Sequence, residues 1–190
     1  LCPNHETYLD GLWVCSFLPP ALLGRLCSLA ASDLKNRHGL LGRIMLRMGR
    51  SIPVDRFGNP VRALIVAKRQ LEKGEIVLLH PEGTRSATGE FGEFKTGAAY
   101  LSVRTGAPIL PVYLDGAYVI FNRHRPLPSL RDPDTRRRRI LKIVFGRPLY
   151  PTKGEDAERL TERLRLWMDE TRAACRAARR QAVRKAGSAQ

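Results

Sequence analysis

The run Ile76-Val77-Leu78-Leu79 is wholly apolar and leads directly into the polar cluster His80-Pro81-Glu82-Gly83-Thr84-Arg85-Ser86. A short apolar run without polar interruption is typical of a parallel strand that is buried on both faces. Open α/β sheets bind ligands at the carboxyl ends of such strands. The sequence therefore predicts that the polar cluster lies at a ligand-binding edge of a sheet.

Strand-like and helix-like patterns alternate on both sides of this run. Further strands are expected at residues 51–55, 109–114 and 140–145. Helices are expected at residues 11–23, 21–31, 39–48, 60–73 and 98–104. Residues 123–139 are rich in arginine and proline, which predicts an exposed excursion with little regular structure. The whole pattern predicts an α/β fold with a mostly parallel central sheet flanked by helices.

The last forty residues predict a separate basic helix. We divide the 190 residues into one domain, 1–150, and a C-terminal amphipathic, arginine-rich helix, 151–190, that packs on it or extends from it. Apolar side chains share one face of this helix: Leu160, Leu164, Trp167 and Met168. Beyond Thr171 every charge is positive, in a basic tail made of Arg172, Arg176, Arg179, Arg180, Arg184 and Lys185. Such a tail suits an anionic lipid surface, and equally a solvated helix end where cations match the macrodipole.

Charge and cysteines limit the partners and the compartment. The net charge of +15 predicts attraction to polyanions, whether nucleic acid, an anionic membrane surface or phosphorylated substrates. The four cysteines show no Cys-x-x-Cys spacing, so neither a zinc ribbon nor a disulfide framework is expected, and a reducing cytoplasm fits. The longest apolar stretch, residues 12–23, is short and contains Pro19 and Pro20, so no transmembrane segment is expected in this chain.

The amino-terminal end suggests a larger protein. The chain begins with Leu1-Cys2-Pro3, which resembles the end of a strand whose beginning is missing. A polar cluster follows at once. We therefore expect an excised domain, with a membrane anchor or another domain upstream.

This first polar cluster, Asn4-His5-Glu6-Thr7-Tyr8-Leu9-Asp10, offers a base and its partner. A carboxylate can fix the tautomer of an imidazole and stabilise its protonated form. Five positions are a poor same-face spacing on a helix, so His5 should precede the helix that contains Asp10. No Gly-x-Ser-x-Gly elbow occurs, so His5 is expected to activate a substrate hydroxyl in a group transfer. A His-Glu-x-x-His metal motif is excluded because Leu9 stands where the motif requires its second histidine, and no metal is expected.

Four blocks in order resemble the glycerolipid acyltransferase family, which includes bacterial 1-acylglycerol-3-phosphate acyltransferases. The first is the Asn-His-x4-Asp pattern from Asn4 to Asp10, and the third is Pro81-Glu82-Gly83-Thr84-Arg85-Ser86. Ile52-Pro53-Val54-Asp55-Arg56 resembles the second, and Ala107-Pro108-Ile109-Leu110-Pro111-Val112 resembles the fourth. The resemblance implies the α/β fold of that family.

The resemblance also implies roles for individual residues. It makes His5 the general base and Asp10 its partner. Arg56 and Arg85 would bind a phosphate, for which guanidinium groups provide paired donors. Lys95 resembles a further basic position. Gly83 permits an unusual backbone conformation, Thr84 can bond ligand or loop, and Glu82 is expected to pair with Arg85 or accept a glycerol hydroxyl.

The implied activity is transfer of a fatty acyl group from acyl-CoA or acyl carrier protein to a lysophospholipid hydroxyl, with 1-acylglycerol-3-phosphate as acceptor. Neither cofactor nor metal is needed, because the thioester is a co-substrate. Thr84, where glycerol-3-phosphate acyltransferases tend to carry glycine, favours a monoacyl acceptor. The expected location is the cytoplasmic face of a membrane.

One alternative comes from another class, a non-enzymatic basic module that binds a membrane surface or nucleic acid. It explains neither polar cluster. Aromatic residues are few and lie mostly in apolar runs, so no nucleic-acid partner is expected.

Overall fold

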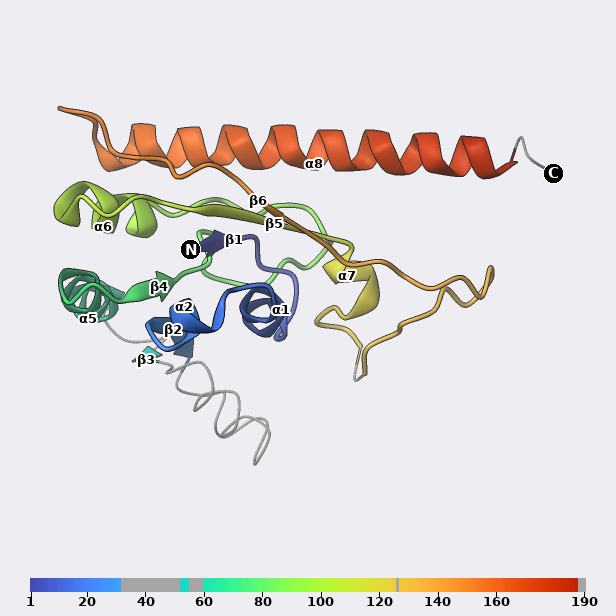
Figure 1. Ribbon diagram of the computed structural model, residues 1–190, viewed down its shortest axis with the longest axis horizontal. Coiled ribbons are helices and arrows are strands. Elements are labelled where there is room, and N and C mark those ends of the chain that lie inside the picture. The colour runs from blue at the N-terminus through green and yellow to red at the C-terminus, as the bar shows by residue number, and fades with distance from the viewer. Residues whose placement is uncertain (32–51, 55–59, 126, 188–190) are drawn as a thin grey trace.

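The computed structural model describes residues 1–31, 52–54, 60–125 and 127–187 (Figure 1). Strands and helices alternate in an α/β fold. The strands are β1 (Cys2–Pro3), β2 (Leu26–Ala31), β3 (Ile52–Val54), β4 (Ile76–Leu78), β5 (Pro111–Asp115) and β6 (Lys142–Phe145). The helices are α1 (Asp10–Ser16), α2 (Pro20–Leu23), α5 (Pro60–Glu72), α6 (Gly97–Thr105), α7 (Ala117–Ile120) and α8 (Ala157–Gly187).

The strands pair in two groups, with the orders β1-β5-β6 and β3-β2-β4. Within the described residues the pairs are parallel except for β5 with β6, which is antiparallel. Two hydrogen bonds join the groups: the N–H of Leu79 donates to the Leu1 oxygen at 2.9 Å, and the Leu1 amine donates to the Val77 oxygen at 2.8 Å. β4 and β1 therefore lie side by side, and each leads into one of the polar clusters.

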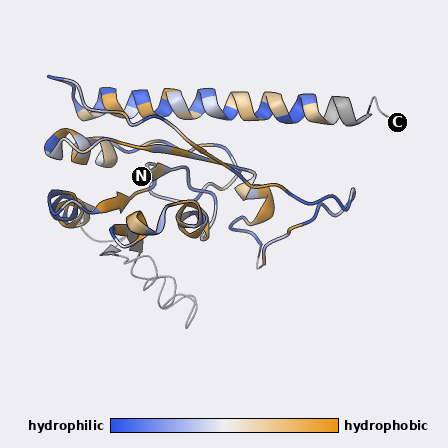
Figure 2. Ribbon diagram, in the orientation of Figure 1, coloured by the Kyte–Doolittle hydropathy of each residue, from blue (hydrophilic) through white to orange (hydrophobic). Residues whose placement is uncertain are grey.

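α8 covers one side of the strands (Figure 1). Leu160, Leu164 and Met168 are fully buried against Ile109 and Tyr113 of the β5 segment, as the helical spacing predicted. Burial of each such side chain contributes about 1.5–3 kcal/mol. Figure 2 shows hydrophilic and hydrophobic residues alternating along α8. In the described part of the chain, no helix combines the length and the apolar content needed to cross a membrane.

The basic tail makes contacts that the sequence did not predict. Arg172 and Arg176 form ion pairs with Glu90, at 2.6 and 2.5 Å, and Arg179 pairs with Asp115 at 2.8 Å. These ion pairs join α8 to the domain, which neither interpretation of the tail included, and the choice between a lipid surface and a solvated helix end stays a prediction. The acidic partners are distant in sequence, which is why the charge run alone suggested a free surface.

The apolar segment 21–31 is not the helix that its composition predicts. α2 ends at Leu23, and the segment from Leu26 becomes β2, which pairs in parallel with β4 and β3. A strand buried between two others is apolar throughout, and periodicity cannot distinguish it from a buried helix. The expected helix at 39–48 lies outside the described residues.

The side chain of Asn4 fixes the loop after β1. It is fully buried, and its Oδ1 accepts the N–H of Leu114 at 2.7 Å while its Nδ2 donates to the Leu114 oxygen at 3.3 Å. This amide therefore continues the pairing of β1 with β5 by one further step. The loop that carries His5 is thereby held at the strand ends.

Candidate active site

His5 and Asp10 form the dyad that the sequence predicted. His5 lies in the loop after β1, and Asp10 is the first residue of α1. The Nδ1 atom of His5 is 3.0 Å from Oδ2 of Asp10. The imidazole is partly buried at the edge of a cavity, while the carboxylate is completely buried.

Asp10 is held by four hydrogen-bond donors. Its Oδ2 accepts the N–H groups of Glu6 and Thr7, at 2.7 and 2.9 Å, besides facing His5. Its Oδ1 accepts the Thr7 hydroxyl at 2.8 Å. Burial raises the pKa of Asp10 to about 6, against the opposing effects of His80 and of the Thr7 hydrogen bonds. The carboxylate is thus fixed in position, and it directs the proton of His5 to Nδ1.

His80 is a site residue that the sequence analysis did not identify. Its ring stacks on His5 with 3.8 Å between centroids and 15° between planes. Its Nδ1 lies 3.1 Å from the carbonyl oxygens of both Pro3 and Asn4. Because carbonyls only accept, this nitrogen carries the proton. Burial, and next the charge of His5, lower the pKa of His80 to about 3, so the stacked ring is neutral.

The same three side chains form a group of the kind that can hold a metal ion. Ligand atoms of His5, Asp10 and His80 lie within 4.8 Å of one another. An ion bound about 2 Å from an imidazole nitrogen lies in the plane of that ring. Two rings stacked nearly parallel at 3.8 Å cannot both meet this condition. The arrangement fits a proton-transferring dyad better, and the expectation of no metal stays a prediction.

Glu82 connects the two polar clusters. Its Oε1 accepts the N–H of His5 and its Oε2 accepts the N–H of Gly92, both at 2.8 Å. Burial raises the pKa of Glu82, and these two hydrogen bonds oppose the shift. Each oxygen of Glu82 thus accepts one main-chain N–H, and the expectation that Glu82 pairs with Arg85 or accepts a substrate hydroxyl stays a prediction. Glu82 positions the loop of His5.

Arg85 rests on Tyr8 of the first cluster. Its guanidinium carbon lies 3.5 Å from the centroid of the Tyr8 ring, and its Nη2 donates to the Tyr8 hydroxyl at 2.7 Å. Between Arg85 and Glu82, Gly83 and Thr84 are exposed, and Gly83 has a φ of +67°, a conformation that favours glycine. Tyr8 stood in the cluster, but nothing in the sequence showed that it meets Arg85.

Two further basic positions were predicted to bind substrate, and the structure describes one of them. Lys95 is exposed at the cavity, and its Nζ pairs with Glu93 at 2.5 Å. Arg56 lies outside the described residues, so its role stays a prediction.

The dyad opens on a large cavity with apolar walls. Its volume is about 1230 Å³, above the roughly 300–1,000 Å³ typical of ligand pockets. His5, His80 and Gly83 line it together with apolar residues from β4, α5, α6 and the loop before α6: Val61, Leu64, Ile65, Leu79, Phe94, Tyr100 and Val103. The imidazole of His5 therefore faces a space suited to a long apolar group.

The stack on His80 predicts a graded effect of two substitutions. His80→Ala should lower kcat about 10- to 100-fold and leave the Michaelis constants little changed, because His5 loses the ring that fixes its plane. His80→Phe keeps an aromatic ring and should retain most of the rate. Steady-state kinetics on both variants measure this. Equal losses would show that the Nδ1 hydrogen bond matters and the stack does not, and a normal rate for His80→Ala would exclude any role of the stack.

Known proteins resemble this chain in sequence and in fold. The model of the family described as Acyltransferase matches residues 1–115. A 1-acyl-sn-glycerol-3-phosphate acyltransferase of Pseudomonas aeruginosa is 31% identical over 67% of this chain and 48% of its own length. A chloroplastic enzyme of the same name from Brassica napus is 33% identical over 61% of this chain and 32% of its own length.

The fold agrees. A crystal structure of the 1-acyl-sn-glycerophosphate acyltransferase of Thermotoga maritima matches 93% of this chain and 65% of its own, with a TM-score of 0.73 at 22% identity. This chain thus spans about a third to a half of the curated relatives. The match of residues 1–115 covers both polar clusters and more than half of the sequence, and the chain belongs to the acyltransferase family.

Proposed function

We propose that this protein transfers a fatty acyl group from an acyl thioester to the free hydroxyl of 1-acylglycerol-3-phosphate. The observation that carries the proposal is the His5–Asp10 dyad, with 3.0 Å between Nδ1 and Oδ2, at the edge of the apolar cavity. The names of the relatives support the acceptor. A non-enzymatic binding module would give no role to a buried, fully bonded Asp10 beside a partly buried histidine.

The geometry supports direct attack by the acceptor. Since Nδ1 of His5 carries the proton that faces Asp10, Nε2 is the basic nitrogen. Nε2 takes the proton of the acceptor hydroxyl while its oxygen bonds to the thioester carbon. The tetrahedral intermediate then breaks its C–S bond, and the thiol leaves with the proton that His5 returns. The fixed charge of Asp10 stabilises the protonated imidazole between the two steps.

Neutrality of His80 contributes to the same step. A second cation stacked at 3.8 Å would oppose protonation of His5, whereas a neutral ring does not. The low pKa of His80 therefore keeps the base effective at working pH.

The test is an assay with purified protein, an acyl thioester and 1-acylglycerol-3-phosphate. Released thiol is measured together with the lipid product, by mass spectrometry. We expect thiol and phosphatidic acid in equal amounts, and acyl-CoA and acyl carrier protein assayed separately identify the donor. Glycerol-3-phosphate and an uncharged monoacylglycerol serve as control acceptors. Thiol release that is independent of any acceptor would indicate a thioesterase and contradict the proposal.

Arg85 provides a prediction about the acceptor. Arg85→Ala should raise the Michaelis constant for the lysophospholipid acceptor about 10- to 100-fold, because a charge-assisted hydrogen bond contributes about 1.5–3 kcal/mol. The Michaelis constant for the thioester should change little. Tyr8→Phe is the matched control, since it removes the hydrogen bond to Arg85 but keeps the stacked ring. If Arg85→Ala affects the Michaelis constant for the thioester alone, Arg85 binds the donor instead.

A further inference from the structure

The excursion between α7 and β6 contains a short hairpin. Arg131 and Arg138 face each other in an antiparallel bridge. The N–H of Asp132 donates to the Arg137 oxygen at 2.9 Å, and Oδ1 of Asp132 accepts the N–H of Thr135 at 3.0 Å. These bonds close a hairpin over residues 130–139, which we call the arginine hairpin. The expectation of little regular structure is confirmed, because no helix or strand lies between α7 and β6 in the described residues, and the hairpin adds one isolated bridge and a turn.

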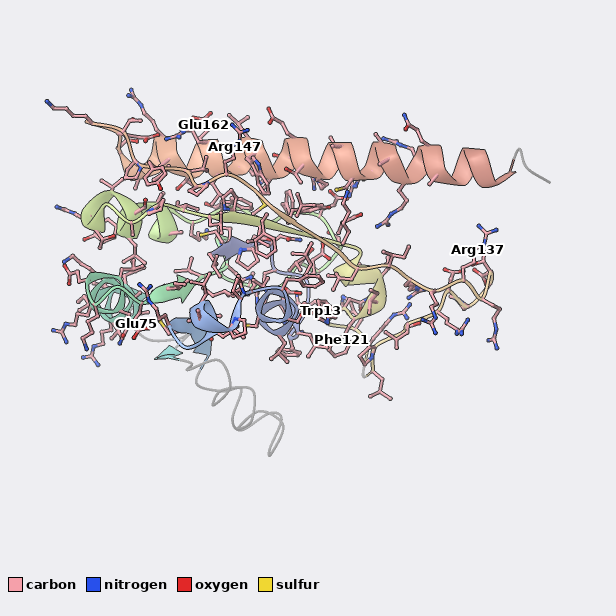
Figure 3. The ribbon with its side chains drawn as sticks, in the orientation of Figure 1. Trp13, Glu75, Phe121, Arg137, Arg147 and Glu162 are labelled. Atoms are coloured by element: carbon pink, nitrogen blue, oxygen red, sulfur yellow. The ribbon has the colours of Figure 1, made fainter. Side chains whose placement is uncertain are left out.

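Positive charge is concentrated here. Residues 123–139 contain seven arginines against two aspartates. Arg139 lies 3.6 Å from Asp132. Within the described part of the chain, no ion pair involves Arg125, Arg136, Arg137 or Arg138, and all four are exposed. Figure 3 shows Arg137 at the tip, pointing away from the body of the protein.

The same excursion carries large, exposed aliphatic side chains. Leu127, Leu130 and Ile140 are 75%, 68% and 75% exposed, more than any other large hydrophobic residue in the described ranges. Single exposed apolar residues need no explanation, but three on one arginine-rich projection form a mixed surface. Arginines with adjacent aliphatic side chains match the interface of an anionic bilayer, where phosphates meet acyl chains.

The base of the excursion is attached to the loop of the third sequence block. The Tyr118 hydroxyl donates to the Ala87 oxygen at 2.6 Å, and Nη1 of Arg123 donates to the Arg85 oxygen at 3.5 Å. His124 lies 3.3 Å from the same Ala87 oxygen. The projection therefore begins next to the arginine that we assign to the acceptor phosphate.

We propose that residues 123–125 and 127–140 form the surface through which this protein docks on an anionic lipid bilayer. The paired arginines of α8 are unsuited to this role because they already hold Glu90 and Asp115. Nucleic acid is a poorer match, because residues 123–140 contain no phenylalanine, tyrosine or tryptophan on which bases would stack. If the protein docks through this surface, a lipid acceptor can reach the edge of the site while it stays in the membrane.

The test is co-sedimentation with vesicles of phosphatidylglycerol and phosphatidylcholine, compared with phosphatidylcholine alone. The charge variant is Arg136→Gln, Arg137→Gln and Arg138→Gln together. Its matched control removes three other exposed arginines, by Arg62→Gln, Arg69→Gln and Arg159→Gln. A basic residue at an anionic surface strengthens binding by up to about fivefold. We expect the charge variant to bind anionic vesicles at least about tenfold more weakly at low salt, and the control to lose much less.

An apolar variant tests the second half of the surface. This variant combines Leu127→Ser, Leu130→Ser and Ile140→Ser and keeps the net charge. Its weaker binding to anionic vesicles should persist at high salt, whereas the difference between the charge variant and the wild type should become smaller there. Both variants should turn over detergent-dispersed acceptor normally, which also shows that they fold. Vesicle binding is measured without turnover, so the docking proposal can fail or succeed independently of the proposed acyltransferase activity.

Three results would overturn the proposal. The first is that both variants bind anionic vesicles as tightly as the wild type does. The second is that the matched control loses as much vesicle binding as the charge variant, because the loss would then reflect only the lower net charge. The third is a charge variant that loses binding to an oligonucleotide or an acidic protein but keeps binding to vesicles. That result would assign the hairpin to another class of partner.

Discussion

Replacing His5 with alanine is expected to lower the rate of acyl transfer about 10²–10⁴-fold, the range that a general base contributes. The fold should survive, because the bond from this loop to Glu82 uses the main-chain N–H of His5 and not its side chain. The assay is thiol release together with lipid product, at saturating concentrations of both substrates. Circular dichroism and thermal unfolding confirm that the variant is folded.

The matched control is His124→Ala, which removes another histidine outside the dyad. His124 is exposed, and its ring contacts only the Ala87 oxygen among the hydrogen bonds of the described residues. It should turn over detergent-dispersed acceptor at the normal rate. Near-normal turnover by folded His5→Ala would refute the mechanism.

Asp10→Asn is expected to lose activity while keeping its stability, with a fall in kcat of up to about 10⁴-fold, as for the equivalent change in a serine-protease triad. An asparagine oxygen in the place of Oδ2 can still accept the N–H groups of Glu6 and Thr7. What disappears is the charge that stabilises protonated His5. Asp10→Ala should lose both, since each buried N–H left unbonded costs about 1–3 kcal/mol. Kinetics and denaturant unfolding of the two variants separate these effects.

The pH dependence of stability gives Asp10 a second signature. Its pKa is about 6 in the folded protein against an ordinary value of 3.8, so the folded state favours the protonated form. The contribution of Asp10 to the free energy of unfolding is therefore largest below pH about 4 and falls as the pH rises to about 6. The stability difference between wild type and Asp10→Asn should change across this interval. A constant difference would mean that the pKa of Asp10 is not raised.

The sequence predicted those features that depend on local pattern. The short strand β4 and the buried face of α8 follow from spacing alone, and the structure has both. The same reasoning failed for β2, because burial on two sides removes the alternation that identifies a strand. Local pattern thus indicated the kind of most described segments, and it failed at 21–31, where an apolar run contains the end of α2 and the strand β2.

Contacts between residues that are far apart in the sequence could not be predicted from local pattern. His80 meets His5 only because β1 and β4 lie side by side, and no spacing within either cluster indicates it. Glu82 was expected to pair with Arg85 or to accept a glycerol hydroxyl, and nothing in its cluster indicated that its two oxygens accept the N–H groups of His5 and Gly92. The arginines of α8 looked free for the same reason, since Glu90 lies 82 residues before Arg172.

The bridge made by Glu82 has a consequence for motion. One buried carboxylate holds the amide of His5 with one oxygen and the amide of Gly92 with the other. If either amide moves away, an oxygen of a buried acid loses its donor, which is costly away from water. Separate movement of the two segments is therefore unfavourable, although they are far apart along the chain. The main chain of His5 is thus connected through Glu82 to Gly92, in the loop that follows Gly83, and we expect a longer loop to shift His5 although the two are not in direct contact.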